Sequence, residues 1–213
     1  MRFRHLMEII DEEPVFESGL LLSGEVNPAD VRRQLARWTR AGRLYQLRRG
    51  VYAPAPPFRK AKPHPFLVAN RMVRGSYVSC QSALAFYGLI PEHVPVVTSV
   101  TTRRPARYDT PLGSYEFRHI KRELLRGYRL TTLQAGQQAF VAGPEKALLD
   151  LIYLQPGADS PDYLQELRLQ NLQQLDVAEL YRQADLAGSP KLRRAAETVA
   201  ALATTEAAEY EEL

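Results

Sequence analysis

Cysteine is nearly absent from this sequence, which has Cys80 alone among its 213 residues. A lone cysteine excludes an intramolecular disulfide and a zinc site made of several cysteines. We expect Cys80 to fill a small space in the core, which fits a reducing cytoplasm. The four histidines are His5, His64, His93 and His119. None lies three or four residues from another, and we therefore expect no metal site.

Long apolar runs are missing as well. No run approaches the roughly 18 residues of a membrane-spanning helix, so we expect no membrane span. The N-terminal residues MRFRHLMEIIDEEP contain acids and no signal-peptide core, which favours a cytoplasmic protein. The phosphate-loop motif, the dinucleotide motif GxGxxG and the zinc-protease motif HExxH do not occur. We therefore expect no cofactor and no catalytic residue.

Positive charge gathers in one stretch of the sequence. The whole chain carries a net charge of +4, with +5 on residues 1–62, +5 on residues 63–154 and −6 on residues 155–213. Within residues 26–62, ten Lys or Arg residues accompany a single acid, Asp30, which gives a local charge of +9. A basic patch of this kind is typical of a surface that binds phosphate, whereas the acidic tail should repel it.

Residues 26–53, at the centre of this patch, predict a helix followed by a short β-hairpin. Asn27 can cap the helix, Pro28 suits its first position and Gly42 can end it. Residues at helical spacing form one apolar stripe, which consists of Val31, Leu35 and Trp38. This stripe should face the core, and we therefore prefer a core role for the tryptophan over base stacking.

Arginines occupy the other faces of this helix and the tip of the hairpin. Those of the helix are Arg32, Arg33, Arg37 and Arg40. Those that would serve the hairpin are Arg43, Arg48 and Arg49. The pattern favours a winged helix-turn-helix, whose helix would enter a DNA major groove while the hairpin touches the backbone or minor groove. The alternative is a solvated surface helix beside a structural hairpin.

The remaining pattern predicts an α+β protein of two domains. Residues 1–53 would form the winged helix-turn-helix, with further helices over residues 2–12 and 15–22. The proline-dense residues 54–63 would form a linker. Residues 64–213 would form a mixed α/β domain with a small, mainly antiparallel sheet and C-terminal helices that end in an acidic tail. We expect the two domains to function separately.

One set of residues in the second domain allows a catalytic alternative. Lys146 and Asp150 can pair at i, i+4 along a helix that begins at Pro144. Glu145 suits the first turn of that helix, beside its positive end. Together with Glu116, these residues could instead bind Mg²⁺ in a nuclease-like site. We prefer the structural interpretation, because helix formation alone explains Glu145, Lys146 and Asp150.

Several segments, taken in order, point to a known family. In the winged part they are Leu35, residues 41–44 and residues 47–52, and in the second domain they are residues 77–79, 82–84, 88–90, 97–102 and 144–150. These segments resemble the AbiEi-type antitoxins, which are transcriptional regulators of type IV abortive-infection toxin–antitoxin operons. The resemblance covers roughly residues 20–154. It departs from the family at Tyr87, where relatives often carry histidine.

The resemblance implies a repressor that binds inverted repeats of double-stranded DNA in its own promoter. It also implies a functional partner, a nucleotidyltransferase-like toxin, which the second domain antagonises without a stable complex. The oligomeric state stays open, with a monomer that binds DNA cooperatively as one arrangement. Two rival interpretations remain, namely a protein-interaction module that blocks a toxin directly and the magnesium-dependent nuclease.

A second group of basic residues lies around two predicted strands, residues 96–102 and 115–120, which should pair. The group consists of Arg103, Arg104, Arg107, Arg118, Lys121 and Arg122. If the strands pair, these side chains gather along one end of the sheet. They would form either a solvated rim or a second anionic contact, with flanking DNA or with the nucleic-acid substrate of a toxin.

Overall fold

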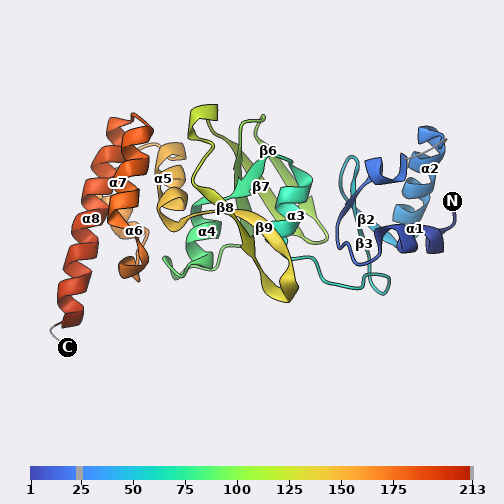
Figure 1. Ribbon diagram of the computed structural model, residues 1–213, viewed down its shortest axis with the longest axis horizontal. Coiled ribbons are helices and arrows are strands. Elements are labelled where there is room, and N and C mark those ends of the chain that lie inside the picture. Colours follow the sequence, from blue (N-terminus) through green and yellow to red (C-terminus); the bar gives the residue numbers. More distant parts are fainter. Residues whose placement is uncertain (23–25, 212–213) are drawn as a thin grey trace.

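The computed structural model describes residues 1–22 and 26–211, which form two sheets flanked by helices (Figure 1). A three-stranded sheet lies with its helices at the N-terminal end, and a six-stranded sheet occupies the middle. Helices from the last part of the chain stand on the side remote from the N-terminal end. This mixture of helices and strands confirms the α+β class. Within the described ranges, no helix is both long and apolar enough to cross a bilayer.

The N-terminal part of the chain (residues 1–54), which we call the first domain, is made of short elements. In chain order they are α1 (Phe3–Ile10), β1 (Phe16–Glu17), the 3-10 helix η1 (Ser18–Leu22), α2 (Pro28–Arg40), β2 (Leu44–Arg48) and β3 (Val51–Pro54). The strands form an antiparallel sheet in the order β1-β3-β2. The expected helix over residues 15–22 is wrong in its first half, because Phe16 pairs with Tyr52 as part of this sheet.

Helix α2 forms where the sequence predicts it. The Asn27 side chain accepts a hydrogen bond of 2.9 Å from a backbone N–H of the first turn. Gly42 follows the helix with a φ of +68°, a left-handed conformation that favours glycine. The apolar stripe is buried, with exposed fractions of 4 % for Val31, 0 % for Leu35 and 2 % for Trp38. The predicted core role of the tryptophan is therefore confirmed.

The second domain (residues 65–211) is built on a six-stranded sheet. Its strands are β4 (Ser76–Val78), β5 (Val96–Thr101), β6 (Ala106–Thr110), β7 (Gly113–His119), β8 (Tyr128–Thr132) and β9 (Gln138–Ala142). The order across the sheet is β6-β7-β5-β4-β9-β8. Two neighbouring pairs, β5 with β7 and β4 with β9, are parallel, and the other neighbours are antiparallel. The pairing of β5 with β7 is confirmed, and the sheet is mixed, with three of these five neighbouring pairs antiparallel.

Helices cover this sheet and continue beyond it. They are α3 (Pro65–Met72), α4 (Cys80–Phe86), α5 (Pro144–Leu154), α6 (Pro161–Glu166), α7 (Val177–Leu186) and α8 (Pro190–Glu211), with 3-10 turns η2 (Arg122–Leu124), η3 (Gln134–Gly136) and η4 (Leu172–Gln174). Helix α5 packs against α4, α7 and α8. Leu164, Leu180 and Val199 from the tail are at most 1 % exposed and belong to the core of the sheet domain. The acidic tail is therefore an integral part of this fold.

Residues of the β2–β3 hairpin pack in two different cores. Leu44 and Tyr52 pack in the first domain's own core, with residues of α1 and α2. Leu47, Val51 and Ala53 belong instead to the core of the second domain. Strand β2 accordingly lies beside β6. A hairpin enclosed in this way is held in one orientation relative to the larger sheet.

The proline-dense segment between the domains is held by both of them. Pro54 ends β3, and Ala55 is only 1 % exposed. The Gln137 side chain donates a hydrogen bond of 2.8 Å to the carbonyl of Lys62 and accepts another of 2.8 Å from the N–H of His64. The segment therefore joins the domains as a fixed connection.

Three ion pairs beside this segment connect the domains. The pairs and their N–O distances are Asp11–Lys60 at 2.6 Å, Glu13–Arg71 at 3.0 Å and Glu17–Arg74 at 2.6 Å. In each pair the acid comes from the first domain, and the cation comes from the connecting segment, from α3 or from the turn between α3 and β4. We call these the interdomain ion pairs. They neutralise acids that would otherwise oppose the positive charge of the first domain.

Candidate nucleic-acid interface

Helix α2 presents its arginines to solvent. The exposed arginines are Arg32, Arg33, Arg37 and Arg40. Because the apolar stripe of α2 is buried, Arg33 and Arg40 lie on the opposite side of the helix. Asp30 lies 3.3 Å from the Arg33 guanidinium, and both side chains are exposed. An exposed pair of this kind is weak, so Arg33 can exchange the carboxylate for another anion.

The hairpin arginines have three different surroundings. Arg49 is exposed at the tip. Arg48 is half-buried, and its Nε is a buried donor without a hydrogen-bond partner. The guanidinium of Arg43 lies 5.2 Å from the ring centre of Phe3 and 6.0 Å from that of Phe58. Of these three arginines, Arg49 is the best placed to contact a phosphate, because its side chain is exposed and makes no ion pair or aromatic contact with the described residues.

The pattern of ion pairing separates two kinds of arginine. Arginines such as Arg71, Arg74 and Arg194 lie within 3.0 Å of a carboxylate and connect parts of the fold. Among the described residues, six arginines of α2 and the hairpin take part in no ion pair, namely Arg32, Arg37, Arg40, Arg43, Arg48 and Arg49. Positive charge that is not neutralised within the fold is available to an external polyanion.

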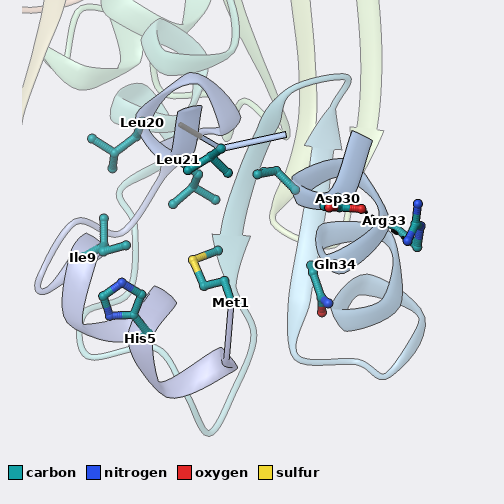
Figure 2. A pocket seen from close by; sticks show the side chains of 10 residues that line it. Met1, His5, Ile9, Leu20, Leu21, Asp30, Arg33 and Gln34 are labelled. Carbon is teal, nitrogen blue, oxygen red and sulfur yellow. Dashed lines mark ion pairs between the residues drawn. The ribbon is translucent and has the colours of Figure 1, made fainter. Parts of the chain in front are cut away.

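An apolar hollow of about 720 Å³ lies beside this arginine face. Figure 2 shows α1, with His5 and Ile9, on one side of the hollow and α2, with Asp30 and Arg33, on the other. Exposed apolar side chains such as Leu20 line it. The dashed line in Figure 2 marks the ion pair between Asp30 and Arg33, at the α2 side of this hollow.

The second basic group gathers around one end of the large sheet. Arg103, Arg104, Arg107, Lys121 and Arg122 are exposed, and Arg118 is half-buried. They come from the β5–β6 loop, β6, β7 and the segment after β7. In the sheet order β6-β7-β5 these elements are neighbours, as the paired strands predicted. A hollow of about 490 Å³ lies among them.

A buried polar cluster lies at the centre of the second domain. Asp150, which is 1 % exposed, forms an ion pair with Lys146 one turn earlier in α5. Its other oxygen accepts hydrogen bonds from the hydroxyls of Tyr77 at 3.0 Å and Ser79 at 2.7 Å. Ser79 therefore uses its hydroxyl on Asp150 instead of capping α4, although it stands at the N-cap position. The predicted pair of Lys146 and Asp150 is confirmed.

Burial governs the protonation of this cluster. It raises the pKa of Asp150, and the Lys146 ammonium and the two hydroxyls lower it only in part. Burial likewise raises the pKa of Tyr77 and of the Cys80 thiol, next to the same carboxylate. Cys80 is fully buried, which agrees with its expected place in the core.

The carboxylates of the nuclease alternative do not converge. Glu145 accepts a hydrogen bond of 2.9 Å from the backbone N–H of Asp176, just before α7. Glu116 is on β7, next to the 490 Å³ hollow. Across residues 1–22 and 26–211, no group of three or more His, Cys, Asp or Glu side chains is arranged to hold a metal ion.

Two sets of contacts escape sequence reasoning. Tyr77 and Ser79 meet Asp150 only because β4 runs beside β9, and β4 is too short to give a strand pattern. Glu17 and Arg74 meet across the domain boundary, which no periodicity reveals. Comparison of the sequence with known protein families and with curated proteins finds no match.

Proposed function

We propose that this protein binds double-stranded DNA through α2 and the β2–β3 hairpin. The observation that carries the proposal is the exposed arginine face of α2, whose charge is largely unpaired while its apolar stripe is buried. The order α1-β1-η1-α2-β2-β3 supports a winged helix-turn-helix, in which α2 would be the recognition helix. Arg33, near the start of α2, is our candidate for a base edge, and Arg37, Arg40 and Arg49 are candidates for phosphate contacts.

We further propose that this DNA is the protein's own promoter and that the protein is a type IV antitoxin. This part rests on the resemblance to AbiEi-type antitoxins over residues 20–154. The functional partner would then be a nucleotidyltransferase-like toxin, antagonised by the second domain without a stable complex. The acidic tail supports separate roles for the two domains, because its charge of −6 makes it unsuitable for phosphate contact.

The first test measures duplex binding by Arg37→Ala/Arg40→Ala at several salt concentrations, using the DNA upstream of the gene and a random duplex. Each lost phosphate contact should reduce the log–log salt slope by about one, so the double variant should lose about two. A matched control is Arg168→Ala/Arg182→Ala, which removes two exposed arginines from the tail. If both double variants bind duplex DNA as tightly as the wild type, α2 is not the interface.

A further inference from the structure

The second domain carries an open hollow of about 490 Å³, whose volume lies within the range of small-ligand sites. It lies where β6 and β7 approach the end of α5, and Ala106, Phe117 and Leu154 contribute its apolar part. Arg107 and Arg118 contribute positive charge. Its other lining residues are Pro105, Glu116 and His119. The hollow therefore combines apolar surface with cations and one carboxylate.

Strand pairing determines which of these side chains share a face. Arg107 is paired with Glu116 across β6 and β7, so both project from the same face of the two strands. Arg118 lies two residues after Glu116 and therefore projects from that face as well. The three charged side chains are adjacent for this reason. This face thus carries two arginines and one glutamate at neighbouring positions.

The charge of the surrounding segment is largely unneutralised. Residues 103–122 contain six Lys or Arg residues and two acids, Asp109 and Glu116, for a net charge of +4. Arg107 lies 3.8 Å from Asp109, at the outer limit of an ion pair. In the described part of the chain, the other five cations take part in no ion pair. After α2 and the hairpin, this is a second surface with charge available to a polyanion.

Internal hydrogen bonds hold two residues of the hollow in place. The Arg118 guanidinium donates to the carbonyl of Leu154 at 3.0 Å, which fixes a half-buried cation between β7 and the end of α5. The ring of His119 lies 3.2 Å from the carbonyl of Arg103 and so connects the end of β7 with the β5–β6 loop. A cation held in this way loses little freedom when it binds an anion.

We propose that this hollow binds the phosphates and a base of single-stranded nucleic acid. A concave site of this size admits a flexible strand or its terminal nucleotide, whereas a stiff duplex cannot bend into it. The arginines would bind phosphate, the apolar residues would contact a base, and Glu116 would accept hydrogen bonds from base amino groups. This activity is separate from duplex binding at α2 and does not depend on it.

Binding of labelled single-stranded RNA and DNA of mixed sequence to the full chain tests the proposal, with a duplex of equal length beside them. Arg103→Ala/Arg104→Ala/Arg107→Ala should lower single-strand affinity about tenfold or more and reduce the log–log salt slope by about two. Arg168→Ala/Arg182→Ala should leave single-strand binding unchanged, and Arg37→Ala/Arg40→Ala should lower it much less than the triple variant does. Competition by a nucleoside monophosphate distinguishes a terminal nucleotide from an internal stretch of strand, and either result supports the site.

The outcomes separate this proposal from the one for α2. Wild-type affinity of the triple variant, equal loss in the tail control, or a preference for duplex would each overturn the single-strand site. Loss of single-strand binding in the α2 variant would move that activity to α2 and overturn it too. An unchanged duplex affinity in the α2 variant would count only against the proposed function. Arg118→Lys, which keeps the charge but removes the planar group, should weaken single-strand binding without changing duplex binding.

Discussion

Arg48 and Arg49 stand next to each other at the β2–β3 hairpin but have different surroundings. Arg49 is exposed, whereas Arg48 is half-buried with an unpartnered Nε. A buried donor without an acceptor costs free energy, and that cost is recovered only if the donor finds a partner. Substitution of Arg48 therefore changes the packing of the hairpin as well as its charge. Arg49 is the cleaner position for testing a phosphate contact.

Asp150 gives a pH-dependent prediction at the scale of one residue. Because burial raises its pKa, the native state binds this proton more tightly than the unfolded chain does. The resulting stabilisation is complete below the unfolded-state pKa and is lost as the pH rises through the native-state pKa. Asp150→Asn, which stays neutral, removes this titration. The stability of the wild type relative to this variant should therefore fall as the pH rises above about 4, the pKa of an unperturbed aspartate.

Denaturant unfolding of both proteins across this range measures the difference in unfolding free energy. A difference that stays constant, or that grows in favour of the wild type as the pH rises, would contradict the prediction. Ser79→Ala is a useful companion, because it removes one hydrogen bond to the carboxylate and leaves the carboxyl group titratable. Because this hydrogen bond lowers the pKa of Asp150, the variant should keep the wild-type direction of pH dependence but lose the stabilisation at higher pH.

Among the elements, the contact between the first domain and α3 gives a second prediction. Glu13→Arg and Arg71→Glu should each lower the melting temperature, because each places like charges together at an interdomain ion pair. The double variant should recover most of the loss. Both side chains are about half exposed, so we expect a coupling of about 0.2–1 kcal/mol. Strictly additive effects in the double-mutant cycle would show that the pair contributes nothing.

The sequence predicts those elements whose apolar pattern is strong. Helix α2 carries Val31, Leu35 and Trp38 at helical spacing, and its caps are local, so its position follows from the sequence. Strand β6 was missed because Arg107 and Asp109 alternate with only half-buried residues, which leaves almost no apolar signal. Strand β6 lies between β5 and β7 in sequence and pairs with β7 in the antiparallel direction, which leaves β5 and β7 parallel. The residues of either strand alone do not show the direction of pairing.

The candidate site also combines features that the local sequence predicts with features that it does not predict. Exposure of the α2 arginines follows directly from burial of the opposite stripe, and helical geometry is enough to predict it. The half-burial of Arg48 has no such local pattern, and its neighbours Leu47 and Val51 pack in the core of the second domain. Contacts between residues far apart in sequence determine this kind of burial. The local sequence pattern does not reveal such contacts.

At the scale of the whole molecule, the helical tail should be essential for folding. Its buried residues Leu164, Leu180 and Val199 complete the core around α5, and Lys191 donates a hydrogen bond of 2.6 Å to the carbonyl of Ile152. A chain ending at Gln155 should therefore lose cooperative unfolding, because the apolar face of α5 becomes exposed. Circular dichroism during heating measures this.

A chain ending at Glu206 provides the control for that truncation. The Glu206 carboxylate accepts hydrogen bonds from the backbone N–H groups of Asn171 at 3.0 Å and Leu172 at 2.8 Å, and this chain keeps both. It should melt cooperatively, close to the full protein. Cooperative melting of the chain ending at Gln155 would mean that the sheet folds without its helical tail.

Strand β6 connects the hollow of the second domain with the β2–β3 hairpin. Strand β6 contributes Arg107 to the hollow of the second domain and touches β2, which leads to the hairpin tip. Because cores are close-packed, β6 cannot shift without either carrying β2 with it or opening a void between them. A displacement of β6, at the edge of the large sheet, would therefore act on the arginine-bearing hairpin by direct packing.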